Sequence, residues 1–261
     1  MLIMFDTHCH LNLPEFANTF GDVIRSGRES GITHFMIPAI DLPTSKKAIE
    51  IADNFVNVFC AVGYHPTIDL EKINLDASMV KLEELLANPK IKAIGEIGLD
   101  YYRYTSPASI QKKFFKSQLE VAIKNDKSVI VHNRAADSDI VSIIESVWSE
   151  HFEKRLVLHC ITPNSTIFDF AKKKNIFIGL DGNLTYDKDK LEFAKNFPLG
   201  LIVLETDSPY LTPEPLKSRH IFPNEPKNLV YVTQKLAEIK QLSVDEVIAK
   251  TTINAKLLFA I

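Results

Sequence analysis

Short runs of apolar and β-branched residues recur along the chain and alternate with stretches of helical periodicity. Runs of this length and composition are typical of strands that are buried on both faces of a sheet. The pattern predicts eight strands, at residues 2–5, 34–39, 58–66, 92–100, 128–133, 155–160, 176–182 and 201–210.

The stretches between the predicted strands read as amphipathic helices. In residues 109–126, Phe115, Leu119 and Ala122 recur at the spacing of one helical face. Gly31 follows the helical stretch 22–30 at a position where a left-handed residue often ends a helix. Two further helices are predicted at 227–240 and 244–260, the second with Ser243 as its N-cap.

The order of these elements predicts the fold class. Successive strands begin about 20–35 residues apart, which is the length of one βα unit. Eight such units in a row indicate a (β/α)8 TIM barrel. An open doubly wound sheet is the main alternative, but it usually carries a glycine-rich first turn, and the first strand is followed by THCHLNLPEF at 7–16. With no linker-like segment in the chain, we expect a single domain over residues 1–261.

Composition and charge narrow the class of protein. The chain has 261 residues, 46% hydrophobic and 24% charged, as expected of a water-soluble globular protein. A net charge of −3 differs from the strongly basic character of dedicated nucleic-acid-binding domains, so a phosphate substrate would need local basic groups or metal ions. No stretch has the features of a signal peptide or of a membrane-spanning helix. We therefore expect a cytoplasmic protein that does not bind membranes, and a monomer.

Histidine and carboxylate side chains gather at one end of the predicted strands. In a strand, residues i and i+2 point the same way about 6–7 Å apart, so His8 and His10 would share one face. A single strand-end histidine is usually structural, but several on one rim are hard to explain by packing. In a TIM barrel the C-terminal ends of the strands form the active site. The residues at those ends are His8, His10, His65, Glu96, His132, His159 and Asp207.

This set of nitrogen and oxygen donors suggests two divalent cations. We predict that His8, His10 and Asp207 hold one ion, that His132 and His159 hold the other, and that Glu96 bridges them. Two ions in such a site can activate a water molecule and stabilise a phosphoryl group. Mg²⁺, Mn²⁺ and Zn²⁺ all accept mixed histidine and carboxylate sites. The three cysteines are an odd number without CxxC spacing, and strand alternation turns Cys9 and Cys160 away from the ligands into the core.

Several motifs resemble one known family along nearly the whole chain. FDTHCHLN (5–12), GYHP (63–66), IGEIGLDYY (94–102), VIVHNR (129–134), LETDSPYLTP (204–213) and NEP (224–226) are similar to motifs of the TatD family of metal-dependent deoxyribonucleases. The resemblance implies the same ligands, namely His8, His10, Glu96, His132, His159 and Asp207. It also implies 3′-to-5′ hydrolysis of single-stranded DNA by a metal-activated water.

Within this reaction, the expected geometry of the rim suggests roles for individual residues. Asp207 would both bind metal and accept a proton from the attacking water, and Glu96 would support catalysis as the shared ligand. His65 and Arg134 are candidate phosphate contacts, and Tyr102 is a candidate platform on which a base would stack. For each of these three residues a purely structural role is the alternative.

Three stretches depart from the family pattern. The family's HCFSG is HCITPNS here (159–165), its SGxxTFKNA is DGNLTYDKD (181–189), and an aspartate common in the family is Ala135. These changes alter the surface that a substrate would meet. Two other functions therefore stay open: a barrel hydrolase acting on an ester or amide such as an aminoacyl-tRNA, and a non-enzymatic barrel that binds a partner. Glu96 stands where many amidohydrolases carry a carbamylated lysine, which favours the nuclease.

Overall fold

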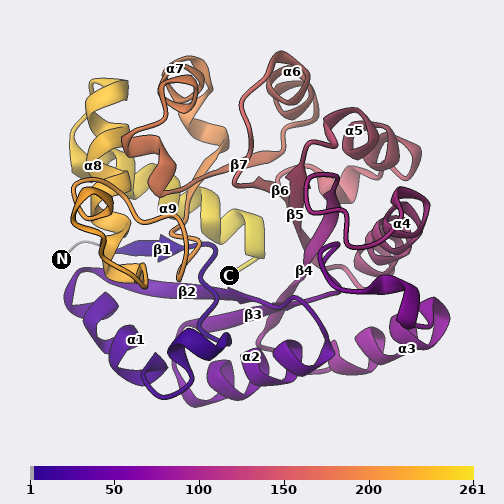
Figure 1. Ribbon diagram of the computed structural model, residues 1–261. Helices are drawn as coiled ribbons and strands as arrows, with labels where there is room; N and C mark the ends of the chain where they lie inside the picture. The colour runs from indigo at the N-terminus through magenta and orange to yellow at the C-terminus, as the bar shows by residue number, and fades with distance from the viewer. Residues whose placement is uncertain (1–2) are drawn as a thin grey trace.

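Eight parallel strands follow one another in chain order around a single barrel-like sheet in the computed structural model, which describes residues 3–261 (Figure 1). The strands are β1 (Met4–Asp6), β2 (Ile32–Pro38), β3 (Val58–Val62), β4 (Ile91–Asp100), β5 (Ser128–Arg134), β6 (Leu156–His159), β7 (Phe177–Leu180) and β8 (Ile202–Leu204). The predicted TIM barrel and its eight strands are confirmed, apart from Leu2, which lies outside the described residues.

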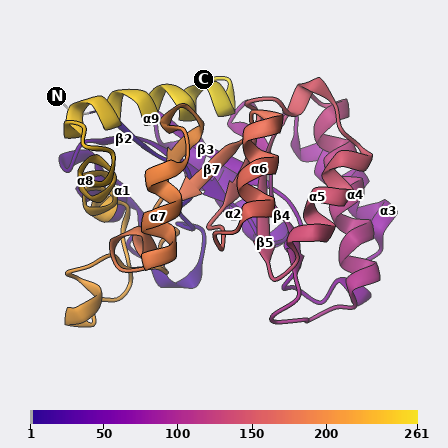
Figure 2. The same cartoon turned by 90° about the horizontal axis from the view of Figure 1, so that it is seen from above.

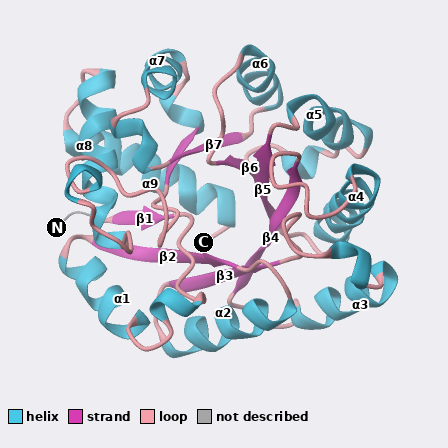
Figure 3. Cartoon of the chain, in the orientation of Figure 1, coloured by secondary structure: helices cyan, strands magenta, loops and turns pink. Residues whose placement is uncertain are grey.

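Most of the helices form a ring outside the barrel (Figure 3). Those in residues 3–261 are α1 (Phe20–Glu29), α2 (Leu42–Asn54), α3 (Leu75–Leu85), α4 (Ala108–Lys124), α5 (Asp137–Ser146), α6 (Ser165–Lys174), α7 (Lys188–Asn196), α8 (Leu229–Lys240) and α9 (Val244–Phe259). The predicted face of α4 is confirmed, because Phe115, Leu119 and Ala122 are fully buried. Within the described part of the chain, no helix is both long and apolar enough to cross a membrane.

Helix ends follow the local chemistry of the sequence. Gly31, just beyond α1, has a φ of 91°, which glycine adopts without the strain that a Cβ would cause. Ser243 caps α9 through a reciprocal capping box with Glu246, in which each side chain accepts a hydrogen bond from the other residue's backbone N–H. Both predicted helix boundaries are therefore confirmed.

Two strands end at least four residues earlier than the sequence pattern predicts, and the other ends agree within two residues. The run 58–66 leaves the sheet after Val62, and the run 201–210 leaves it after Leu204. In the second case Asp207 has a φ of 52° and Pro209 has no backbone N–H for a sheet hydrogen bond. The residues beyond each strand end build the rim of the barrel instead.

The barrel closes between β8 and β1 through contacts just beyond the regular strands. The backbone N–H of Thr7 donates to the carbonyl of Leu204 at 3.1 Å, and the N–H of Asp207 donates to the carbonyl of His8 at 2.8 Å. The buried carboxylate of Asp6 accepts hydrogen bonds from the backbone N–H and the hydroxyl of Thr206. These bonds fix the β8 end directly beside the β1 end.

Helix α9 covers the N-terminal end of the barrel (Figure 2). Thr252 donates to the carbonyl of Ile3 ahead of β1, and the Asn254 amide donates to the carbonyl of Ile202 at the start of β8. Ser128, the first residue of β5, donates its hydroxyl to the carbonyl of Leu258 in α9. The opposite, C-terminal end of the strands is thus the end that remains open to a ligand.

Candidate metal centre and active site

A cavity of about 590 Å³ opens at the C-terminal ends of the strands. Five of the six predicted metal ligands line it, and the sixth, His8, lies beneath with no exposed surface. The ligands that line the cavity are His10, Glu96, His132, His159 and Asp207, together with the predicted substrate contacts His65 and Arg134. Residues from almost every part of the chain are therefore brought to one concave site.

One group of donor atoms gathers around the end of β1. His8 Nε2 and His10 Nε2 lie 3.0 Å apart, so the predicted pairing of these two side chains is present. Glu96 Oε2 lies 3.4 Å from the first nitrogen and 3.5 Å from the second. Asp207 Oδ1 lies 3.7 Å and 3.5 Å from the same two nitrogens. The four donors thus enclose a common point.

A second group surrounds the other oxygen of Glu96. Glu96 Oε1 lies 3.0 Å from His132 Nδ1, 3.3 Å from His65 Nε2 and 3.5 Å from His159 Nε2. Glu96 therefore presents one carboxylate oxygen to each group of histidines. His65, which we expected to contact substrate, lies among these ring nitrogens and is held at Nδ1 by the hydroxyl of Thr67.

The position of Glu96 depends on an irregularity in β4. The pairing of β4 with β5 shifts register between Ile94 and Ile97, as at a β-bulge, and Glu96 lies within this shift. Its backbone N–H donates to the carbonyl of Ala39, beyond the end of β2, at 2.9 Å. Bulges of this kind re-aim a side chain, and this one coincides with the residue whose carboxylate joins the two donor groups.

Burial and the neighbouring charges shift the pKa values of the carboxylates and imidazoles in the site. Burial alone would raise the pKa of Glu96, but the histidines around it together outweigh burial and hold that pKa well below its usual range. Burial opposes a charge on His159, yet the carboxylates of Glu205 and Glu96 raise the pKa of its imidazole to about 10. At His65 burial prevails and lowers the pKa to about 4, so this ring is neutral at pH 7.

These residues fit a divalent cation. The Nε2 atoms of His8 and His10 face each other and can share at most one proton. At least one of the two nitrogens therefore has a lone pair available to a metal ion. Ligand atoms that bind one ion at about 2.1 Å lie roughly 3.0–3.4 Å apart, close to the separations in the first group. A mixture of imidazole nitrogen and carboxylate oxygen suits Zn²⁺ and Mn²⁺, and carboxylates also suit Mg²⁺.

Two carboxylates that sequence reasoning missed orient the histidines. Glu205 Oε1 lies 2.8 Å from His159 Nδ1, and Asp100 Oδ2 lies 3.0 Å from His132 Nε2. Such partners of ligating histidines fix the ring orientation. Their spacing of two or four residues from a ligand is only a weak signal, because the register shift at Glu96 and the left-handed backbone of Asp207 interrupt the strand alternation. Gly179 of β7 leaves room for the Glu205 carboxylate, which a Cβ at that position would strike.

The two cysteines beside the ligands behave differently. Cys9 is fully buried and its thiol donates to the carbonyl of Met36, so its predicted place in the core is confirmed. The prediction for Cys160 is wrong, because this residue lines the cavity. Its backbone has a φ of 44°, which ends the strand alternation directly after His159 and turns the thiol toward the site.

The predicted substrate contacts Arg134 and Tyr102 form a pair at the cavity mouth. The guanidinium carbon of Arg134 lies 4.1 Å from the centroid of the Tyr102 ring, and 71% of Tyr102 is exposed. No carboxylate of residues 3–261 forms an ion pair with Arg134. A cation stacked on an exposed aromatic ring leaves the other ring face free to meet a base.

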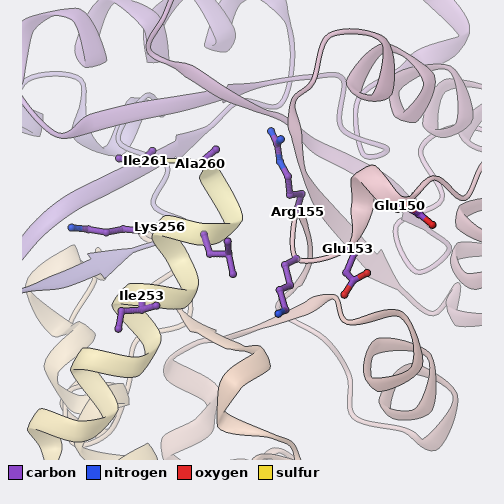
Figure 4. A pocket seen from close by; sticks show the side chains of 9 residues that line it. Glu150, Glu153, Arg155, Ile253, Lys256, Ala260 and Ile261 are labelled. Atoms are coloured by element: carbon purple, nitrogen blue, oxygen red, sulfur yellow. The ribbon is translucent and has the colours of Figure 1, made fainter.

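The other end of the barrel carries a second hollow, of about 780 Å³, between α9 and the segment that leads into β6 (Figure 4). Its lining combines exposed apolar residues of α9, such as Ile253, with Glu150, Glu153 and Arg155. None of the described histidines lines it, and none of the donor groups that could hold an ion includes a residue from it. The chemistry therefore concentrates at the C-terminal rim.

Barrel and donor groups together define a metal-dependent hydrolase of the (β/α)8 class, and comparison with known proteins gives its family. Residues 5–260 match the family described as TatD related DNase. The chain belongs to this family, as its motifs indicated, and it is therefore an enzyme that acts on ester bonds.

Individual relatives agree with this placement. The chain is 33% identical to the uncharacterized metal-dependent hydrolase YabD of Bacillus subtilis, over 99% of this chain and all of that one. It is 30% identical to the 3′-5′ ssDNA/RNA exonuclease TatD of Escherichia coli K12, over 99% of both chains. Its fold matches the crystal structure of YJJV, a TatD homologue from E. coli K12, with a TM-score of 0.87 and 25% identity, over 100% of this chain and 98% of that one.

Proposed function

We propose that this protein is a 3′-to-5′ exonuclease that removes nucleotides from single-stranded nucleic acid, with DNA as the expected substrate. The observation that carries the proposal is the Glu96 carboxylate, whose two oxygens each face a separate group of histidines on the cavity floor. A site for two ions about 3.5–4 Å apart is typical of enzymes that cleave phosphodiesters. The chain is 30% identical, over 99% of its length, to a 3′-5′ exonuclease of single-stranded DNA and RNA, and this similarity supports the same reaction.

The donor groups assign the metal ligands. His8, His10 and Asp207 would hold one divalent cation and His132 and His159 the second, with Glu96 between them. Such ions would lower the pKa of a water molecule and neutralise charge on the phosphoryl group. We expect Mg²⁺, Mn²⁺ or Zn²⁺ in both places.

Asp207 is the proposed proton acceptor. Its carboxylate lines the cavity, and burial, which would raise its pKa, is outweighed by the neighbouring His10, His159 and His8, so that pKa is below its usual range. The group is therefore ionised at neutral pH and can take a proton from the attacking water. A positioned general base of this kind contributes about 10²–10⁴-fold to a rate.

The remaining predicted residues would bind the strand. Tyr102 would stack on an unpaired base and Arg134 would contact a phosphate at the cavity mouth, which explains a preference for single strands, whose bases are free to stack. His65 would help to orient the phosphate beside Glu96. We further propose that residues 1–261 work as one hydrolase domain in a monomeric, cytoplasmic enzyme.

The test is hydrolysis of single-stranded oligonucleotides labelled at either the 3′ or the 5′ end. Metal-stripped protein is titrated with Mg²⁺, Mn²⁺ or Zn²⁺, with DNA and RNA strands of equal sequence and Glu96→Ala as the inactive control. We expect stepwise shortening from the 3′ end, two bound ions per chain by elemental analysis, and an activity loss on the order of a thousandfold in Glu96→Ala. A protein that binds two ions yet cleaves no strand under any metal would overturn the proposal in favour of an ester or amide substrate.

A further inference from the structure

A buried lysine lies in the wall of the active-site cavity. Lys190, in the first turn of α7, is only 4% exposed, and its side chain lines the cavity together with Cys160 and Asp187. Lysine is almost never buried without a partner, because removing an ammonium group from water is costly. We therefore expect a buried partner for the Lys190 ammonium.

The partner of Lys190 is Asp181, which follows directly after β7. Asp181 has no exposed surface, and its Oδ2 lies 2.8 Å from Lys190 Nζ. Its other oxygen accepts a hydrogen bond of 2.7 Å from the backbone N–H of Asn183, so the carboxylate is held from both sides. The ammonium is consequently fixed in place, in contrast to the lysine side chains on the surface of α7.

The Asp181–Lys190 pair occurs in one of the stretches where this chain departs from the family pattern. In the pattern SGxxTFKNA the first position is serine and the seventh is lysine, whereas this chain has Asp181 and Asp187 there. Lys190 lies three positions beyond the pattern's lysine, and the pattern ends one residue before it. The acid of the pair, Asp181, is therefore one of the departures from the pattern.

Lys190 retains hydrogen-bonding capacity. Its ammonium has three N–H donors, of which one is satisfied by Asp181 and a second weakly by Cys160 Sγ at 4.0 Å. Among the hydrogen bonds of residues 3–261, Lys190 Nζ makes no third. A donor is therefore available to an acceptor that enters the cavity.

Lys190 lies beside the candidate metal ligands, where a bound nucleic-acid strand would pass. The thiol of Cys160 lies within 4.8 Å of a carboxylate oxygen of Asp207 and 4.0 Å from the ammonium of Lys190. The ammonium is therefore separated from the ligand cluster by the width of one side chain. Arg134 and Tyr102 belong to the β4 and β5 side of the rim, so a strand that crosses the ligands from there continues toward α7.

We propose that Lys190, held by Asp181, binds the phosphate of the nucleotide next to the one being cleaved. This inference rests on the proposed nuclease function and adds a specific contact to it. The contact lets the enzyme distinguish a polynucleotide from a diester that has a single phosphate. Lys190 is thereby assigned to substrate binding, beside the metal ligands that carry the chemistry.

The experiment compares two charge removals on the same helix. In Asp181→Asn/Lys190→Met both members of the buried pair become neutral, which avoids the unpaired buried carboxylate that Lys190→Met alone would leave. The matched control is Lys188→Met, which removes an exposed charge two residues earlier on α7. KM and kcat for a single-stranded oligonucleotide are measured over a series of KCl concentrations, and thermal unfolding checks that both variants fold.

We expect the double variant to raise KM about tenfold, because a hydrogen bond between charged groups is lost, with a much smaller change in kcat. The salt dependence of log KM should fall by about 0.7, the value for one phosphate contact on a single strand. Lys188→Met should change neither quantity. If wild-type enzyme cleaves the strand but the double variant matches this control, the inference about Lys190 is overturned and the proposed nuclease function stands. If wild-type protein neither binds nor cleaves the strand, the proposed function is overturned together with it.

Discussion

The two ends of the barrel satisfy their polar groups in opposite ways. At the N-terminal end, side chains of α9 such as Thr252 and Asn254 donate to carbonyls at the starts of strands, so each donor has a permanent partner. At the C-terminal rim, imidazole nitrogens of His8 and His10 face each other and the carboxylates of Glu96 and Asp207. There the polar atoms are arranged around common points instead of being paired one to one.

This difference separates stability from function within one fold. A buried carbonyl with a fixed donor contributes to the free energy of unfolding, and losing that donor costs stability. A group of converging lone pairs is less favourable in the protein alone, and binding of a cation is what stabilises it. Changes at the two ends should therefore affect different measurements: activity and metal affinity at the rim, stability at the N-terminal end.

Among three substitutions that test this difference without removing a metal ligand, Glu205→Gln should have the largest effect. The substitution keeps a side-chain oxygen that can accept from the His159 ring and from the Cys160 N–H, but it removes the charge that holds the imidazole. We expect a loss of about 10–100-fold in metal affinity or activity, the usual result of removing the partner of a ligating histidine. Metal titration followed by a hydrolysis assay measures it. Unchanged metal affinity and activity would show that Glu205 has only a packing role.

A smaller effect is expected at the mouth of the cavity. Tyr102→Ala removes the exposed ring over which Arg134 lies. Stacking of a base on an aromatic side chain contributes about 1–3 kcal/mol, so KM for a single strand should rise about tenfold. Tyr102→Phe is the matched control and should keep wild-type KM, because it keeps the ring. Equal KM values in the alanine and phenylalanine variants would contradict a stacking role.

The smallest effect on activity is expected from Asn254→Ala in α9. Its amide donates to the carbonyls of Leu199 and Ile202 at 2.9 Å and 2.7 Å. The Leu199 carbonyl keeps a bond from the backbone N–H of Ile202, so the main loss is the side-chain donor to the Ile202 carbonyl. The free energy of unfolding should fall by about 2 kcal/mol, since each buried unsatisfied group costs about 1–3 kcal/mol. Urea denaturation measures this, with kcat/KM expected to stay at the wild-type value. A loss of activity without a loss of stability would contradict the assignment of stability to the N-terminal end of the barrel.

Much of the site could be predicted from the sequence because strand ends repeat one geometry. Four ligands (His8, His10, His159 and Asp207) stand at or just beyond a strand end, and Glu96 and His132 lie in the C-terminal halves of β4 and β5. Parallel strands in a barrel bring those ends to one rim. The prediction for Cys160 failed because one left-handed backbone angle ended the alternation on which it relied. The Asp181–Lys190 pair was missed because α7 begins within the loop after β7 and turns Lys190 back into the cavity.

The sequence by itself determined the barrel, the order of its units and the residue types that meet at its rim, because periodicity and strand-end motifs act over short distances along the chain. Only the tertiary structure decided which atoms lie next to one another. Glu96 can face two histidine groups because of the register shift in β4. Asp100 and Glu205 can orient His132 and His159 because the fold brings these side chains together. Such contacts join residues up to 46 positions apart, as for His159 and Glu205, and no local pattern specifies them.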